Sequence, residues 1–339
     1  MIYRIISLIL SALIFILVGC SSTDKDNEGI MIFESGSYPH IIKDNGTYYY
    51  TMPQSQPGRI SIYSTKDPLE LGKVDPIVVW KTTSDNYNNI WSPELHKIGD
   101  KWYIYFEGDD GNTDNHHLYV LENGSSDPTK GVWELKGPIM TNEEWNYGIH
   151  PSTFSVNGHR YLIWSGWEKR RMEAETQCIF IAEMENPWTL KSERVLISRP
   201  QFEWERQWIN PDGSRSAYPI FVNENPEAFV SPDGENVVLL YSSSGIWTVY
   251  NNLGMLTAKT SSDLLNPNSW KKNPEPVFTS TDNSRFHGSS NVTLAPDKDD
   301  EGEILLYQVK YKDLPHEHDA VLLKKVKWDG DSILNLGFI

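Results

Sequence analysis

Five segments of the chain share one order of features: a short apolar stretch, a tight turn, and a second stretch rich in aromatic and β-branched residues. They read SYPHIIKDNGTYYY, WSPELHKIGDKWYIYF, IHPSTFSVNGHRYLIW, NENPEAFVSPDGENVVLLYSS and SSNVTLAPDKDDEGEILLY. The turn dipeptides NG, GD, NG, DG and EG are typical of β-hairpins. The segments recur at intervals of roughly 55–75 residues, which is the spacing of propeller blades or a similar array.

This repeat predicts an all-β fold, a five-bladed β-propeller, over residues 31–339. No stretch keeps a helical period, and Gly, Pro, Asn and Asp interrupt the chain often. A β-sandwich uses the same strands and turns and is the alternative. The regular recurrence of five units favours the propeller.

A proline stands near the start of four of the repeats, at Pro39, Pro93, Pro151 and Pro226. We expect each to be the first residue of an inner strand, where no ladder N–H is required. In a ring, the residues beside these prolines converge on one central pocket. They are Tyr38, His40, Ser92, Glu94, His150 and Glu224, with His287, Ser290 and Asn291 from the fifth repeat.

The N-terminus reads MIYRIISLILSALIFILVGCSS, with one Arg before an apolar run. This pattern is typical of a signal peptide, and LVGC resembles a bacterial lipobox, so we expect residues 1–20 to be a lipoprotein signal that ends at Cys20, the lipid carrier. A transmembrane anchor is the alternative. Residues 21–30 are polar and are expected to form a flexible tether. An exported lipoprotein at the outer membrane or cell surface of a Gram-negative bacterium follows, with the periplasmic face as an alternative.

The charge and the remaining cysteine limit other functions. The formal net charge is -16 with no basic cluster, which argues against nucleic acid as a partner. With Cys20 lipidated, Cys178 has no intrachain partner, and we expect it to be a buried strand residue. A monomer is expected.

The chain resembles glycoside hydrolase family 43, in the branch of exo-α-L-arabinofuranosidases and arabinanases. The segments that carry the resemblance are IWSPELHKIGDKWYIYFEGDDGNTDNHHLYVLEN, YLIWSGWE, NPWTLKSERVLISRPQFEWE, VNENPEAFV, YSSSGIWTVYNNLGML and NPEPVF. The family implies a five-bladed propeller that cleaves arabinose or xylose linkages with inversion, using a general-base Asp, a tuning Asp and a general-acid Glu.

One of these three carboxylates matches the family pattern. Glu224 in NENP stands at the position of the acid. Tyr38 in SYP takes the place of the base, and His150 in IHP takes the place of the tuning Asp. Ser290 replaces a histidine that the family often has near the axis, and His287 lies three residues before it. An inverting reaction still requires a group that activates water.

His150 is the first candidate for this base and Glu94 the second, because an imidazole or a carboxylate accepts a proton near pH 7. Tyr38 as a nucleophile, or Tyr38 with His150 in β-elimination, is a further alternative. Asp109, Asp110, His116 and His117 are expected at the rim. The residues expected to bind sugar are His40, Trp91, Trp167, Trp204, Trp247, His287 and Asn291.

The sequence therefore predicts a hydrolase that releases a terminal pentose from oligosaccharides or polysaccharides, of α-L-arabinofuranosidase or β-xylosidase type. A cell-surface carbohydrate-binding protein without turnover, or a Tyr/His-based polysaccharide-cleaving enzyme, is the alternative. No metal ligand set is assigned, and a structural Ca²⁺ or other ion near the axis is left open.

Overall fold

The computed structural model describes residues 28–54, 58–82, 87–142, 147–169, 175–209, 215–282, 284–300, 302–314, 318–329 and 333–336. The expected signal peptide with Cys20, and the tether up to residue 27, lie outside these residues. None of the helices in the described ranges has the length and apolar character that crossing a membrane requires.

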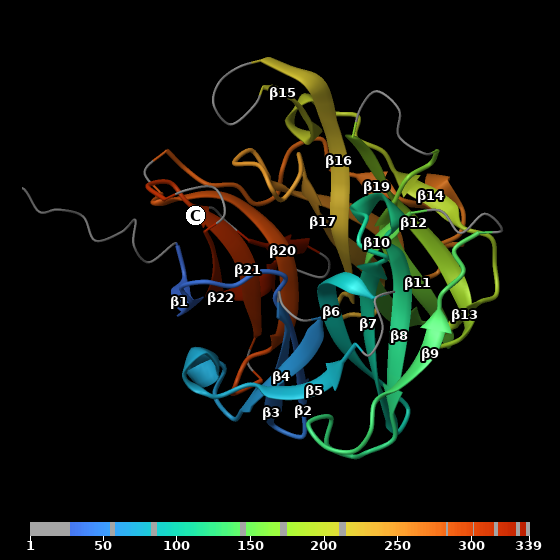
Figure 1. The fold of residues 1–339 in the computed structure, drawn as a ribbon. Helices are drawn as coiled ribbons and strands as arrows, with labels where there is room; N and C mark the ends of the chain where they lie inside the picture. The colour runs from blue at the N-terminus through green and yellow to red at the C-terminus, as the bar shows by residue number, and fades with distance from the viewer. Residues whose placement is uncertain are drawn as a thin grey trace, which may run out of the picture.

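The predicted all-β class is confirmed, since the described residues form strands and short 3₁₀ helices (Figure 1). The strands fall into five antiparallel groups in chain order. The first group is β2 (His40–Asp44), β3 (Thr47–Gln54), β4 (Arg59–Thr65) and β5 (Ile77–Lys81). The second is β6 (Asn88–Ile98), β7 (Lys101–Asp109), β8 (His117–Asn123) and β9 (Glu134–Pro138). The third is β10 (Gly148–Val156), β11 (His159–Gly166) and β12 (Glu175–Asn186), with β13 (Thr189–Leu190) and β14 (Val195–Ser198) at its edge.

The fourth group is β16 (Arg215–Val230), β17 (Asn236–Ser243), β18 (Leu253–Lys259) and β19 (Lys271–Lys272), with β15 (Arg206–Ile209) beside β16. The fifth is β20 (Phe286–Pro296), β21 (Glu303–Tyr311) and β22 (Asp319–Asp329), with β1 (Ile30–Phe33) and β23 (Ile333–Asn335). The 3₁₀ helices are η1 (Pro68–Lys73), η2 (Thr113–Asn115), η3 (Glu203–Glu205) and η4 (Pro267–Ser269). A short parallel pairing between β12 and β16 joins the third and fourth groups into one sheet.

The two ends of the described chain meet in the fifth group. β1 pairs antiparallel with β22, with Ile30 opposite Leu323. Glu28, placed by the sequence in the tether, accepts a hydrogen bond from the backbone N–H of Arg285 at 3.0 Å. The body of the protein therefore begins a few residues before position 31.

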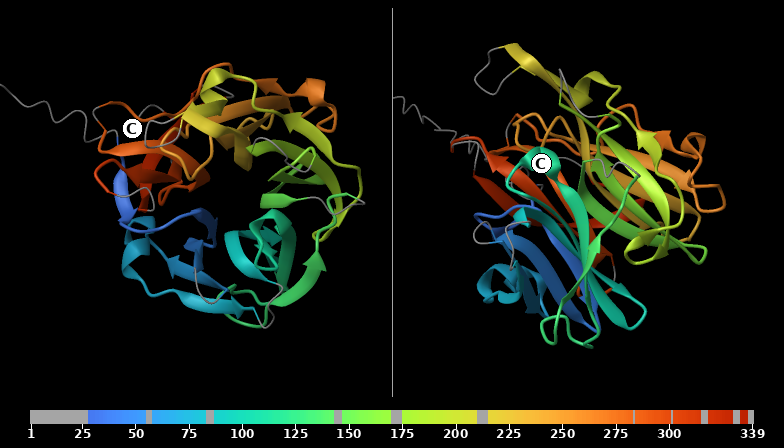
Figure 2. Two further views of the ribbon diagram at one scale, coloured as in Figure 1. Left: turned by 45° about the horizontal axis from the view of Figure 1, so that its top comes forward. Right: turned by 45° about the vertical axis from the view of Figure 1, so that its right-hand side comes forward.

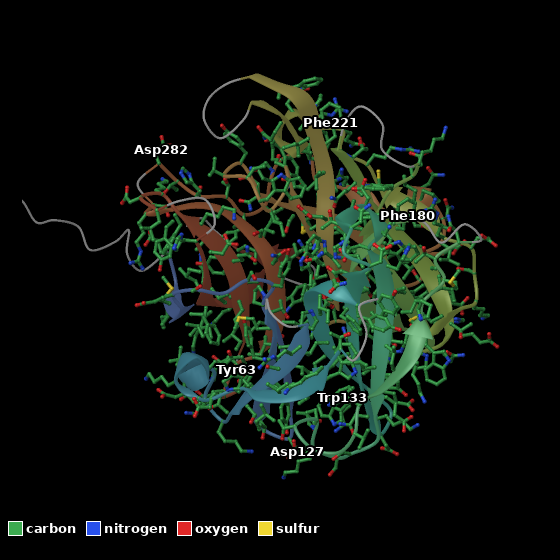
Figure 3. All side chains as sticks on the ribbon, in the orientation of Figure 1. Tyr63, Asp127, Trp133, Phe180, Phe221 and Asp282 are labelled. Atoms are coloured by element: carbon green, nitrogen blue, oxygen red, sulfur yellow. The ribbon has the colours of Figure 1, made fainter. Side chains whose placement is uncertain are left out.

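Five buried apolar clusters lie between consecutive strand groups, and the fifth joins the last group to the first. In this last cluster Tyr48 and Tyr50 of β3 pack with Leu306 of β21 and Val321 of β22. Tyr63, Trp133 and Phe180, labelled in Figure 3, belong to three different clusters. Each buried large side chain contributes about 1.5–3 kcal/mol. The groups accordingly surround a common centre, as the left view of Figure 2 shows.

The inner end of each group carries one non-glycine residue in the left-handed backbone region. These residues and their φ angles are Tyr38 (52°), Ser92 (39°), His150 (54°), Asn225 (50°) and Asn291 (46°). Such a conformation costs about 1–3 kcal/mol and persists only where the surroundings enforce it. In the second to fifth groups it coincides with a shift of strand register.

The expectation that each proline is the first residue of its strand is wrong for three of the four. Pro39 does precede β2, but Pro93, Pro151 and Pro226 lie inside β6, β10 and β16 at the register shifts. A bulge leaves its extra residue outside the hydrogen-bond ladder, so a proline is tolerated there.

Gly254 shows how tightly the strands approach one another. It lies opposite Tyr241 in the β17–β18 pair, and a Cβ placed on it would meet the Tyr241 ring at 2.0 Å. The Tyr241 hydroxyl is held by a 2.8 Å hydrogen bond to buried Glu205, so the ring has no room to withdraw.

We predict that Gly254→Ala lowers the free energy of unfolding by about 1–3 kcal/mol, the usual cost of overpacking. Gly124→Ala is the matched control, because a Cβ at this position would meet no atom within 4 Å. Chemical denaturation followed by tryptophan fluorescence measures both. Equal denaturation midpoints for the two variants would contradict the prediction and show that the Tyr241 ring can move to make room for the added methyl group.

Candidate active site

A pocket of about 670 Å³ lies at the inner ends of the strand groups, within the size range of small-ligand sites. Residues from all five groups line it. They are Ser37, Tyr38, Trp91, Thr113, Asp114, Tyr147, Ile149, His150, Trp167, Gln177, Glu224, Ile246, Trp247, Gln308, Lys310 and Asp319. Tyr38, His150 and Glu224, which the sequence placed side by side, are therefore brought together.

Glu224 is presented by the bulge of β16 and is 1% exposed. Its Oε1 accepts a 2.7 Å hydrogen bond from the backbone N–H of Ile246. In a regular strand, residues three apart face opposite sides. The bulge lets Glu224 reach the pocket while Glu227, on the same strand, lines a smaller cavity beside it.

His150 lies between two carboxyl groups. Its Nδ1 is 3.8 Å from Glu224 Oε2 and its Nε2 is 3.7 Å from Glu107 Oε1, both longer than a hydrogen bond. Burial, followed by the charge of His116, lowers its pKa well below the usual 6.5. His150 is therefore a neutral imidazole beside the expected acid, which is a poor position for a group that must activate water on the opposite face of the sugar.

Glu107 is a carboxyl group that the sequence did not single out. It is fully buried on β7 and accepts a 3.0 Å hydrogen bond from Ser92 Oγ. Burial raises its pKa to about 8, so it carries a proton at neutral pH. Its position in FEGDDG, within a strand, gave no local signal that it would lie against His150.

Tyr38 occupies the place where the family pattern has a base. Its backbone N–H donates to Gln308 Oε1 at 2.9 Å. Burial raises the pKa of its hydroxyl well above 10, and the charges of Glu107, Glu224 and Asp319 raise it further. A phenol in these surroundings keeps its proton, so the geometry does not favour Tyr38 as a nucleophile or base.

Asp319, at the start of β22, is a second pocket carboxylate that sequence reasoning missed. Lys310 Nζ donates to its Oδ1 at 2.6 Å, and the Lys310 side chain is only 4% exposed. Gln308 also hydrogen-bonds the Asp319 carboxylate. No proline or repeat signature marks position 319, which explains why the pattern did not reveal it.

Three of the four predicted tryptophan platforms line the pocket. Trp91 stacks on His116 and Trp167 on Tyr147, each pair with ring centroids 4.0 Å apart. Trp247 is 44% exposed.

The prediction that Trp204 is a sugar platform of the pocket is wrong, because Trp204 lies outside the pocket lining. Its indole N–H donates to the carbonyl of Pro274, and its ring packs on the cluster between the third and fourth groups. The neighbouring sequence, EWE, contains no sign of which face the ring takes. Asp109 and His116, expected at the rim, are both buried and lie 3.3 Å apart, with His116 supporting Trp91.

Four other predicted residues also lie outside the pocket lining. His40, Glu94 and Asn291 line a separate cavity of about 20 Å³, which Tyr38 also borders. Burial raises the pKa of Glu94 to about 8. Glu94 therefore holds a proton in a space too small for a sugar, which argues against its role as the base. His287 does not line either cavity.

His40, Glu94 and His96 form the one group in the described residues whose ligand atoms are spaced for a metal ion. The backbone N–H of Leu95 donates to His40 Nδ1 at 3.2 Å, so the neutral ring carries its proton on Nε2. That Nε2 lies 3.6 Å from Glu227 Oε1 and 3.9 Å from Glu94 Oε2. In this tautomer His40 Nε2 has no free lone pair, and Ca²⁺ prefers oxygen ligands, so this set does not fit Ca²⁺.

Known proteins resemble this chain over most of its length. The profile of glycosyl hydrolases family 43 matches residues 32–334. An extracellular exo-α-(1→5)-L-arabinofuranosidase of Streptomyces avermitilis is 33% identical over 316 residues, 90% of this chain and 62% of the relative. An extracellular exo-α-(1→5)-L-arabinofuranosidase of Streptomyces chartreusis is 32% identical over 281 residues, which are 81% of this chain and 80% of the relative. The crystal structure of an α-L-arabinofuranosidase from Lactobacillus brevis superposes with a TM-score of 0.81 at 27% identity. The match covers 93% of this chain and 98% of that one.

The chain thus spans about three fifths of the length of the Streptomyces avermitilis relative.

We predict that Glu107→Gln changes the pH dependence of stability. The carboxyl keeps its proton up to about pH 8 in the folded protein, against an ordinary pKa of 4.5, so wild-type stability falls as pH rises between these values. The Gln variant lacks this loss. It should match the wild type near pH 4.5 and exceed it at pH 8 by on the order of a few kcal/mol.

Denaturation at a series of pH values measures this difference, with Glu203→Gln, at an 87% exposed side chain, as the control. A difference between wild type and Glu107→Gln that stays constant with pH would contradict the assigned protonation.

Proposed function

Because the chain belongs to glycosyl hydrolases family 43, we propose that it hydrolyses the bond to a terminal α-L-arabinofuranosyl residue of an oligosaccharide. The observation that carries this proposal is Glu224, a buried carboxyl group that reaches an aromatic-walled pocket. Two relatives are named as exo-α-(1→5)-L-arabinofuranosidases, which supports arabinose over xylose as the released sugar.

Glu224 is the general acid in this proposal. It donates its proton to the glycosidic oxygen as the bond to the anomeric carbon breaks. The N–H of Ile246 binds Oε1, which fixes the carboxyl group and leaves Oε2 on the side of His150. Trp91, Trp167 and Trp247 supply apolar faces on which a sugar ring stacks.

We propose that the strands form a five-bladed β-propeller, each strand group being one blade. The five clusters between consecutive groups, with β1 paired to β22, support this arrangement. The domain expected over residues 31–339 is then one propeller that begins a few residues earlier, at Glu28, with its site at the axis.

A binding protein without turnover is the second candidate function. It is favoured by one observation: Tyr38 keeps its proton at neutral pH, and the lowered pKa of His150 makes that imidazole a weak base. Such a protein would retain the aromatic walls and the hydrogen bonds of Glu224 to sugar hydroxyls.

We predict that wild-type protein hydrolyses 4-nitrophenyl α-L-arabinofuranoside faster than the β-D-xyloside. Glu224→Gln should lower kcat/KM about 10²–10⁴-fold on α-1,5-linked arabino-oligosaccharides, because their alkoxide leaving group requires the proton of the general acid. Glu203→Gln, at an 87% exposed side chain outside the pocket lining, is the matched control and should retain activity within about threefold.

Release of 4-nitrophenol, release of arabinose from arabino-oligosaccharides and calorimetric binding of these oligosaccharides are measured together. Binding with no turnover by the wild type would contradict the hydrolase proposal and support the binding protein.

We further propose that the chain is exported as a monomeric lipoprotein with Cys20 as its lipid carrier, which rests on LVGC after the apolar run. Cys20→Ser should abolish incorporation of labelled palmitate and move the protein from the membrane to the soluble fraction. Labelling that persists in the variant would exclude Cys20 as the acceptor.

A further inference from the structure

The proposed reaction lacks an assigned proton acceptor. Inverting hydrolysis needs a carboxylate that activates water on the face of the sugar opposite the acid, with the two carboxyl groups about 6.5–9.5 Å apart. Among the described residues that line the pocket, the carboxyl groups are Glu224, Asp114 and Asp319. Asp114, on η2, has its backbone bound to Asn112 in a local turn.

Asp319 lies beside the segment in which the family pattern places the base. The backbone N–H of Gly36 donates to the Asp319 carbonyl at 3.1 Å, two residues before Tyr38. Tyr38 lies within the electrostatic reach of both Asp319 and Glu224. The two carboxyl groups come from different strand groups, β22 and β16, and both reach the pocket that Tyr38 lines.

A set of fixed donors holds the Asp319 side chain. Gln308 Oε1 accepts from the Tyr38 backbone N–H at 2.9 Å and from Asn291 Nδ2 at 2.5 Å. With its oxygen occupied by two donors, the Gln308 amide presents its N–H group to the Asp319 carboxylate. Lys310 donates to the same carboxylate from the neighbouring strand.

Lys310 and Gln308 are the groups that favour an ionised Asp319 carboxylate against the effect of burial. Lys310 is the single cationic side chain among the described lining residues, given a neutral His150. The groups that face Asp319 are the Lys310 ammonium, the His318 imidazole and the neutral hydroxyl of Tyr38. Burial raises the Asp319 pKa above 3.8, while Lys310 acts in the opposite direction.

We infer that Asp319, oriented by Lys310 and Gln308, is the general base of this enzyme and replaces from β22 the carboxylate that is missing at position 38. This inference rests on the proposed hydrolase function. Water oxygen forms the new bond to the anomeric carbon as the bond to the leaving oxygen breaks. One water proton passes to the Asp319 carboxylate, and the Glu224 proton passes to the leaving oxygen.

The test is the kinetics of Asp319→Asn in the full chain with 4-nitrophenyl α-L-arabinofuranoside. We expect kcat/KM to fall at least 10³-fold. Azide needs no deprotonation, so it should restore the rate and yield an arabinofuranosyl azide of inverted anomeric configuration. Asp300→Asn, at a 73% exposed side chain outside the pocket lining, is the matched control and should stay within about threefold of the wild type.

Lys310→Met supplies a second readout that does not depend on the stability of the Asn variant. A base acts when deprotonated, so activity falls as pH drops through its pKa. Removal of the Lys310 charge raises that pKa, and the acidic limb of kcat/KM should move to higher pH by about one unit. A purely structural ion pair would not move it.

The outcomes separate the two proposals. Asp319→Asn with more than a tenth of wild-type activity, while Glu224→Gln is inactive, overturns the inference and leaves the hydrolase intact. Loss of activity without azide rescue, together with an unshifted acidic limb in Lys310→Met, also overturns it. A wild type that cleaves no aryl furanoside or xyloside contradicts the proposed function itself, and the inference with it.

Discussion

The left-handed backbone at the inner end of each strand group is the constraint on which the site depends. Four of the five residues that adopt it, from Tyr38 to Asn225, are followed directly by proline. A residue before proline is restricted toward extended conformations, so the left-handed state is costly there. The packing of five apolar clusters offsets that cost and holds each bulge. Each bulge changes which side chains of its strand reach the centre, as Glu224 and Glu227 show.

Burial then decides the protonation of the groups that the bulges bring together. Glu94 and Glu107 are largely removed from solvent, and burial raises the pKa of each to about 8. His40 and His150 lie in the same region, and burial keeps both imidazoles neutral. The side chains around the axis therefore carry much less charge at neutral pH than their number of Glu and His residues suggests. A carboxylate that must stay ionised has to lie beside a cation, and Lys310 provides that at Asp319.

The sequence predicted the fold class and the convergence of Tyr38, His150 and Glu224, because turns and prolines repeat in register with the strands. It misplaced Trp204, since a pattern of aromatic residues does not distinguish a pocket wall from a core. It missed Asp319 and Glu107 for another reason. Both lie on strands without a proline mark, and their positions beside Tyr38 and His150 follow from contacts distant in sequence. The base assignments to His150 and Glu94 relied on ordinary pKa values, which burial changes.

The most direct measurement is a crystal structure of the Glu224→Gln variant with α-1,5-linked arabinobiose bound. The account predicts one water that bridges the Asp319 carboxylate and the anomeric carbon, on the face opposite the leaving oxygen and the amide introduced at position 224. Two results would contradict the role of Asp319 as the base: an Asp319 carboxylate that hydrogen-bonds the ring hydroxyls of the sugar, or one that lies on the same face of the sugar as the side chain at position 224.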